Sequence, residues 1–184
     1  MRLLLSSLLV LSCGLLACSG GAPSDGKSQS TTSQFRSAGG EHFTAYADPY
    51  GDGRPNPLAG IRGNVEIFTV SEQDAKDYGM DASTDVWVSV WGLPKGATFP
   101  AHVHVKPCAP PDKGAGHYQN VAGGPADDTN EVHLSIAADE GGFAFAQAHA
   151  AFGVRSGEAK SIVLHDALPV VGKLPKLACV DVVF

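Results

Sequence analysis

The stretch DVWVSVW, residues 85–91, indicates the fold class. Valine and tryptophan dominate it, and β-branched and aromatic residues are enriched in strands. Trp87 and Trp91 lie four positions apart, so they share one face of a strand, which we expect to be the buried face. We therefore predict a strand at residues 85–91 that pairs with other strands of the same domain.

Outward from this stretch, other short segments have the same β-rich character and are separated by Gly, Pro, Asp and Asn. No amphipathic helix of useful length is apparent. This recurrence predicts an all-β domain, either an antiparallel sandwich or a Greek-key barrel. The further strands are expected at residues 42–47, 60–70, 99–105, 131–137, 143–150, 159–165 and 177–184.

The composition limits the classes of partner. Of 184 residues, 43% are hydrophobic and 17% charged, and the formal net charge is −6. That charge argues against a nucleic-acid partner, because such binding needs a dense basic face. We expect one β domain over residues 41–184, a length that supports a single core.

The first residues, MRLLLSSLLVLSCGLLAC, are typical of an export signal. One arginine precedes an apolar run that is short for a membrane span. The end of the run resembles a bacterial lipobox, which implies a signal peptide over residues 1–17 and a lipidated Cys18. Lipidation at Cys13 and an ordinary secretory signal are the alternatives. Residues 18–40, rich in Ser, Gly, Thr and Gln, are expected to form a flexible tether.

Two cysteines remain in the domain, Cys108 and Cys179. Disulfides persist outside the cytoplasm, where an export signal would deliver the chain. We expect a disulfide between these two residues, and two buried free thiols are the alternative.

The stretch AHVHVKPC, residues 101–108, contains a candidate metal site. His102 and His104 share one face of a strand, and imidazole is a good ligand for copper and zinc. Taken alone, the pair also fits an edge strand with a polar face. The long loop over residues 106–130 has no clear periodicity, and such loops are often functional. It contains His117 among glycines, and His165 ends a later apolar strand.

Five motifs follow one another in order: HVHVxxC, GxGHYQN, GGP, SIVLH and LAC. In this order they resemble the copper/zinc superoxide dismutases. The resemblance runs from about Phe99 to Cys179 and extends loosely over the earlier strands. It implies an eight-stranded antiparallel Greek-key β-barrel with long loops. It also implies a copper enzyme that converts superoxide to dioxygen and hydrogen peroxide.

The resemblance assigns roles to individual residues. The paired copper ligands on one strand match His102 and His104. The histidine that bridges copper and zinc in the family matches His117, which would also deliver a proton, and the fourth copper ligand matches His165. The family's intrasubunit disulfide matches the pair Cys108 and Cys179.

The zinc ligands of the family do not carry over. Ala122 stands where the family has a histidine before Gly-Gly-Pro, and the next histidine position falls near Thr129. The family's aspartate falls near Glu131 or Val132. The sequence therefore resembles the copper-only branch of the family, and we expect zinc to be absent.

Without zinc, the outer nitrogen of His117 needs another partner to fix its tautomer. Glu131 is a candidate, and a solvated carboxylate at a strand end is the alternative reading. A weak substitute zinc site made from His117, His133 and Asp127 or Asp128 is a further alternative.

The segment between His165 and Cys179 is short, whereas the family has a long charged electrostatic loop there. By resemblance, Lys176 takes the place of the family's arginine before Leu-Ala-Cys. A lysine attracts an anion but lacks the bidentate fork of arginine, so weaker docking of superoxide is expected.

We therefore expect an extracytoplasmic copper-dependent superoxide dismutase in a bacterial cell envelope, attached to the membrane only through a lipid at Cys18. The serine after Cys18 favours the outer membrane, by resemblance to lipoprotein sorting signals. A copper-binding or copper-delivery lipoprotein without turnover is the main alternative, and a structural domain with a decayed metal site is the other.

Overall fold

The computed structural model describes residues 43–170 and 172–184. The predicted signal over residues 1–17, the lipidated Cys18, the tether over residues 18–40 and His42 lie outside the described residues. The elements in chain order are β1 (Thr44–Ala45), β2 (Arg62–Val70), α1 (Glu72–Tyr78), β3 (Ser83–Trp91), β4 (Thr98–His104), β5 (His133–Ala137), β6 (Phe143–Ala150), β7 (Ser161–His165) and β8 (Lys176–Asp181). Each strand overlaps one of the predicted ranges.

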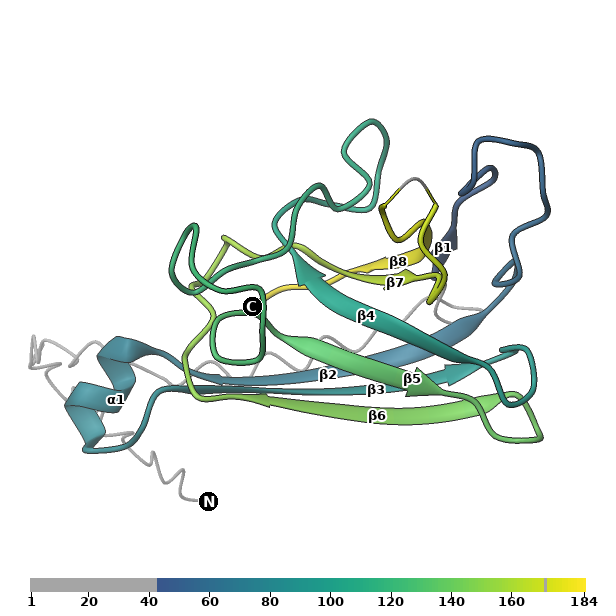
Figure 1. The fold of residues 1–184 in the computed structure, drawn as a ribbon. Helices are drawn as coiled ribbons and strands as arrows, with labels where there is room; N and C mark the ends of the chain where they lie inside the picture. The colour runs from purple at the N-terminus through teal and green to yellow at the C-terminus, as the bar shows by residue number, and fades with distance from the viewer. Residues whose placement is uncertain (1–42, 171) are drawn as a thin grey trace, which may run out of the picture.

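The strands form two antiparallel sheets (Figure 1). One has the order β1-β8-β7-β4-β5 and the other the order β2-β3-β6. The predicted all-β class is confirmed. The two sheets are not closed into a barrel. Of the two expected architectures, sandwich and barrel, the structure is therefore the sandwich of two packed sheets. Strands that are distant in sequence, such as β4 and β7, become hydrogen-bonded neighbours.

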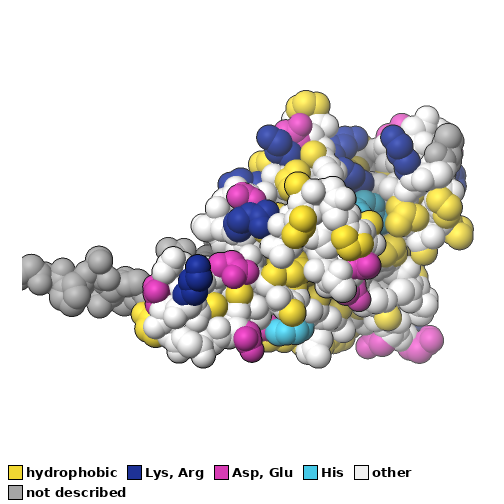
Figure 2. All heavy atoms as spheres, turned by 60° about the vertical axis from the view of Figure 1, so that its left-hand side comes forward, with side chains coloured by type: hydrophobic (Ala, Val, Ile, Leu, Met, Phe, Trp, Pro, Cys, Tyr) yellow, Lys and Arg dark blue, Asp and Glu magenta, His cyan; other side chains and the backbone are white. Residues whose placement is uncertain are grey.

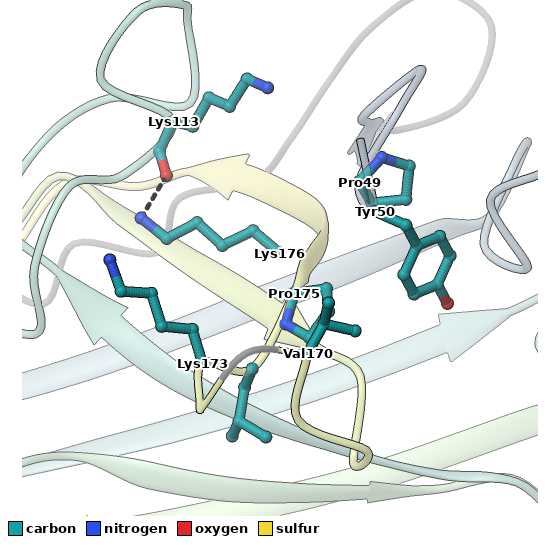
Figure 3. Close-up of a pocket in the computed structure, with 8 residues that line it drawn as sticks. Pro49, Tyr50, Lys113, Val170, Lys173, Pro175 and Lys176 are labelled. Atoms are coloured by element: carbon teal, nitrogen blue, oxygen red, sulfur yellow. Dashed lines mark hydrogen bonds between the residues drawn. The ribbon is translucent and has the colours of Figure 1, made fainter. Parts of the chain in front are cut away.

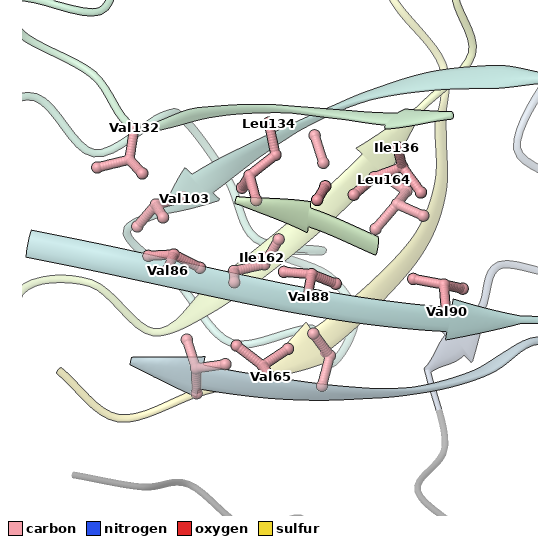
Figure 4. Close-up of a cluster of buried hydrophobic side chains, with 14 of the residues drawn as sticks. Val65, Val86, Val88, Val90, Val103, Val132, Leu134, Ile136, Ile162 and Leu164 are labelled. Atoms are coloured by element: carbon pink, nitrogen blue, oxygen red, sulfur yellow. The ribbon is translucent and has the colours of Figure 1, made fainter. Parts of the chain in front are cut away.

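The core lies between the two sheets (Figure 4). Successive side chains of a strand point to opposite faces, so every second residue enters the core. In β3 these residues are Val86, Val88 and Val90, each almost fully buried. From the opposite sheet, Val103 of β4 and Ile162 of β7 belong to the same buried cluster.

The predicted burial of the two tryptophans is wrong. Trp87 and Trp91 do share one face of β3, but it is the outer face of the sheet. Trp91 is 40% exposed and contacts Phe143 of β6 at 5.3 Å between ring centroids. Asp85 and Ser89 share the tryptophan face of DVWVSVW, whereas the other face carries only valine, so the alternation itself indicates which face enters the core. The valines occupy that face.

The helix α1 was missed by the sequence analysis. Its N-cap is Ser71, whose Oγ accepts a hydrogen bond from the Asp74 amide at 3.1 Å, and Gly79 ends it in the left-handed conformation. Only Ala75 of this seven-residue helix is buried, so it lacks a long apolar stripe. No helix within residues 43–170 and 172–184 is long and apolar enough to cross a bilayer.

Candidate metal centre

Four histidines converge on the outer face of the five-stranded sheet, beneath the loop that joins β4 to β5. Ala101 and Val103 of β4 are buried in the core, so His102 and His104 point to the other face. Antiparallel pairing sets β7 beside β4, and His165 is the last residue of β7. His117 comes from the long loop and forms an isolated β-bridge with His104.

The four imidazoles are close enough to share one metal ion. His102, His104, His117 and His165 each offer a nitrogen, and these four atoms lie within 4.8 Å of one another. The Nε2 atoms of His104 and His165 are 3.2 Å apart. The rings of His102 and His117 stack with centroids 4.1 Å apart. The structure thus brings together all four predicted copper ligands.

Hydrogen bonds hold the outer nitrogens of three of these rings. The Nδ1 atoms of His104 and His165 lie 3.1 and 3.3 Å from the carbonyl oxygens of Ala115 and Leu174. The Nδ1 of His117 lies 2.7 Å from Oε2 of Glu131. A carbonyl or carboxylate can only accept, so Nδ1 carries the proton in each ring. Nε2 is then left with a free lone pair, as a metal ligand requires.

His102 provides the test of whether the residues fit a metal. Its Nδ1 is buried and has no hydrogen-bond partner among the described residues. Burial of a polar nitrogen without a partner costs free energy, so such atoms are rare in folded proteins. A metal ion bound among the four imidazoles would satisfy this atom. The residues therefore fit an imidazole-bound metal such as copper.

Burial keeps three of the imidazoles neutral. It lowers the pKa of His102 to about 2, of His104 to about 3 and of His165 to about 4. For His102 and His104, the neighbouring histidine charges lower the pKa further. A metal ligand must be deprotonated, so these side chains are ready to bind at neutral pH without losing a proton.

The same pKa shifts predict how the stability of the metal-free chain depends on pH. The pKa of each of the three histidines is lowered from 6.5 in the folded state. Below pH 6.5 these histidines therefore bind protons in the unfolded chain but not in the folded chain. The free energy of unfolding decreases as the pH is lowered through this range. The limiting slope is about 1.4 kcal/mol per pH unit for each histidine.

Urea unfolding at pH 7.5, 6.5, 5.5 and 5.0 measures this dependence. The range above pH 5 largely avoids the carboxyl groups, whose ordinary pKa values lie near 4. A free energy of unfolding that stays constant between pH 6.5 and 5.0 would contradict the prediction.

Glu131 is the hub of the hydrogen bonds behind His117. The carboxylate is 3% exposed and accepts from Nδ1 of His117, from Nε2 of His133 at 3.0 Å and from the Gln119 amide at 2.8 Å. Burial raises its pKa, but the hydrogen bonds from His133, Gln119 and His117 outweigh burial and lower the pKa overall. Glu131 is thus an anion at neutral pH, in position to hold the His117 tautomer.

Gln119 was missed as part of this network, although it stands two residues after His117 in the quoted GxGHYQN motif. Asp127 does not join the network, because its Oδ1 accepts from the backbone and hydroxyl of Thr129. Asp128 contacts Nδ1 of His133 at 2.9 Å but is largely exposed. A strand register that pairs His133 with His102 brings this group to the metal centre.

We expect Glu131→Gln to weaken metal binding about 10- to 100-fold, the range for loss of a residue that orients a ligand. The amide loses the charge and presents N–H donors toward His117, so the Nδ1 proton is no longer favoured. Titration against a competing chelator measures the affinity. Glu66→Gln, on the exposed face of β2, is the matched control. Equal affinity for Glu131→Gln and wild type would contradict the assigned role.

His117, Glu131 and His133 form a second group with potential ligand atoms within 4.8 Å of one another. The acidic member is Glu131 and not Asp127 or Asp128, the two residues considered from the sequence. The facing atoms of this group hydrogen-bond one another. The absence of zinc remains a prediction.

The predicted disulfide is confirmed. Cys108 and Cys179 are bonded, with Cα atoms 5.6 Å apart. The bond ties the start of the long loop to β8, and the Cys108 amide also donates to Oδ1 of Asp181 at 2.7 Å. The loop that carries His117 is therefore anchored close to the sheet that carries the other ligands.

Lys176, at the start of β8, lies beside the histidines. Its Nζ donates to the carbonyl oxygens of Lys113, at 3.0 Å, and Ala115. Burial, and secondarily the charge of Lys113, lowers the pKa of Lys176. The Ala115 carbonyl also accepts from His104, so Lys176 holds the loop segment that orients one ligand. Two of its three N–H groups are used in this way.

Little of the histidine cluster reaches the surface. His104 and His165 are 1% and 4% exposed, and histidine appears only as small patches among the surface atoms in the view of Figure 2. The side chain of His117 is 33% exposed, so this ligand is open to solvent. Neither a protein-family model nor a curated protein sequence matches this chain.

Proposed function

We propose that this protein is a copper-dependent superoxide dismutase of the copper-only type, with an eight-stranded Greek-key fold like that of the copper/zinc family. The observation that carries the proposal is the convergence of four imidazole nitrogens within 4.8 Å, one of them buried without a partner. The order of the sequence motifs, which resembles that family, selects copper among the metals that imidazole binds.

His102, through Nδ1, and His104, His117 and His165, through Nε2, would hold the copper. When bound, copper supplies a one-electron couple, Cu(II)/Cu(I), which zinc lacks. The chain's own contribution is to orient the imidazoles, to exclude water by burial and to supply protons. His117 is the residue suited to pass a proton to the product, because its side chain is 33% exposed and Glu131 holds its outer nitrogen.

A copper-binding or copper-delivery protein without turnover is the second candidate, and one observation favours it. The ammonium group of Lys176, the residue that would attract superoxide, is engaged with two backbone carbonyls and has one N–H left. An anion near the metal would therefore be held more weakly than by a free cation. By resemblance of residues 1–18 to a lipoprotein signal, either protein would act in a bacterial envelope, anchored through a lipid at Cys18.

Pulse radiolysis of the copper-loaded full chain tests the proposal, with the metal content assayed on the same sample. We expect first-order decay of superoxide with a catalytic constant approaching the diffusional range of about 10⁸–10⁹ M⁻¹s⁻¹, with copper but no zinc present. One tightly bound copper per chain with no acceleration of the decay would instead support the copper-binding protein.

A further inference from the structure

A cavity of about 330 Å³ has none of the four histidines in its lining. Figure 3 shows the residues that line it. The loop before β2 contributes Pro49 and Tyr50, the long loop contributes Lys113, and the segment leading into β8 contributes the rest, including Lys173 and Lys176. Three lysines thus meet at one cavity from two segments distant in sequence. Such a gathering of like charges is unfavourable unless something compensates it.

No carboxylate compensates these lysines within the described part of the chain. None of the residues that line the cavity is acidic, and none of the ion pairs among the described residues involves Lys113, Lys173 or Lys176. Asp166 contacts the lining from outside, where its carboxylate accepts the Tyr50 hydroxyl at 2.7 Å. The chain as a whole is acidic, with a net charge of −6, so this local excess of cations is a specific feature.

The lysines differ in how far they are available. Lys113 Nζ lies 5.2 Å from the centre of the Tyr46 ring, and Lys176 has one N–H not engaged with backbone carbonyls. Lys173 is exposed at the rim. In Figure 3 the ammonium groups of Lys173 and Lys176 point in the same direction. Lys173 and the remaining N–H of Lys176 are therefore the donors open to a ligand.

We propose that this cavity binds a small organic anion whose head is a doubly charged oxyanion, of the class of phosphate monoesters. The charge follows from the lysines of the lining, among which Lys173 is exposed and Lys176 keeps one N–H not engaged with backbone carbonyls. The organic body follows from the size, because about 330 Å³ corresponds to roughly eleven waters at about 30 Å³ each, more than a bare phosphate fills. Pro49 and Val170 supply apolar wall for that body.

Two backbone contacts join this cavity to the metal centre. Leu174, which lines the cavity, accepts from His165, and the Ala115 carbonyl is shared by Lys176 and His104. A bound anion therefore lies beside two of the histidines without touching them. The inference itself does not depend on copper or on turnover.

Isothermal titration of the metal-free full chain tests it, at pH 8 and low ionic strength, with inorganic phosphate and phenyl phosphate as separate probes. We expect saturable binding of both, with phenyl phosphate the tighter. Lys173→Gln should weaken binding about fivefold, the effect of losing a contact worth about 1 kcal/mol. The double variant Lys113→Gln/Lys173→Gln should weaken it further. Lys95→Gln removes the same charge from the β3–β4 turn, outside the cavity, and should leave binding unchanged.

Failure of both probes to saturate would overturn the proposal, and so would equal binding by wild type and Lys173→Gln. If potassium chloride at matched ionic strength gave the same heats as the phosphate probes, the signal would reflect charge screening alone. That result would also overturn the proposal. If phenyl phosphate bound more weakly than inorganic phosphate, the claim that the ligand has an organic body would be wrong. Because no metal is present, none of these results bears on the dismutase proposal, which the radiolysis experiment tests separately.

Discussion

His165→Ala is expected to lower the affinity for copper by more than about 100-fold and to abolish copper-dependent activity. Loss of a residue that merely orients a ligand costs 10- to 100-fold, and loss of a ligand itself should cost more. His165 is 4% exposed, and its Nε2 lies 3.2 Å from that of His104, so no other described side chain replaces it at that position. Competition with a chelator of known copper affinity measures the change.

His149→Ala is the matched control for this experiment. His149 is exposed on the outer face of β6, where its Nδ1 lies 2.8 Å from Asp85, and it is not among the four converging histidines. Its loss should leave both copper affinity and activity unchanged. If His165→Ala bound copper as tightly as His149→Ala, the four-histidine site would be wrong.

Removing the disulfide, with Cys108→Ala/Cys179→Ala, is expected to lower the free energy of unfolding by about 4 kcal/mol. The two cysteines are 71 positions apart, and in the chain-entropy model a crosslink over a loop of that length restricts the unfolded chain by this amount. Both residues are also buried, so the small alanine side chains add a cavity cost. Guanidinium unfolding of the metal-free chain measures the difference.

Reduction of the wild type separates the loss of the crosslink from the change of sequence. Wild type reduced with dithiothreitol should lose stability to a similar extent, because the same constraint is removed without a change of sequence. Copper affinity should fall as well, since Cys108 anchors the start of the loop that carries His117. A double variant within 1 kcal/mol of wild type would show that the crosslink contributes little.

Much of the fold was accessible from local patterns. The eight strand positions followed from β-rich segments between turn residues, and each was found. The observed bounds of β6, Phe143–Ala150, equal the predicted range of 143–150. A glycine pair precedes the strand in the sequence, and its pairing with β3 ends at Ala150. The burial of Trp87 and Trp91 was predicted wrongly, although Asp85 and Ser89 on the same face of β3 indicate the solvent side. The helix α1 was missed because it buries a single residue.

For the metal centre, the sequence by itself determined the candidate ligands. The period of a strand puts His102 and His104 on one face, whichever partners the strand acquires. The cysteine count and the export signal added the pair Cys108 and Cys179, and the order of motifs added His117 and His165. These inferences rest on local geometry and on resemblance, and neither depends on knowing how distant segments pack.

Only the tertiary structure decided which atoms face the metal and what holds them. The outer nitrogen of His104 bonds to Ala115, that of His165 to Leu174, and that of His117 to Glu131. The two partners of each contact are 9 to 14 residues apart. No repeating pattern in the sequence links the partners. The three lysines of the anion cavity meet for the same reason. Long-range antiparallel pairing and the disulfide set these distances, and no local pattern in the chain encodes them.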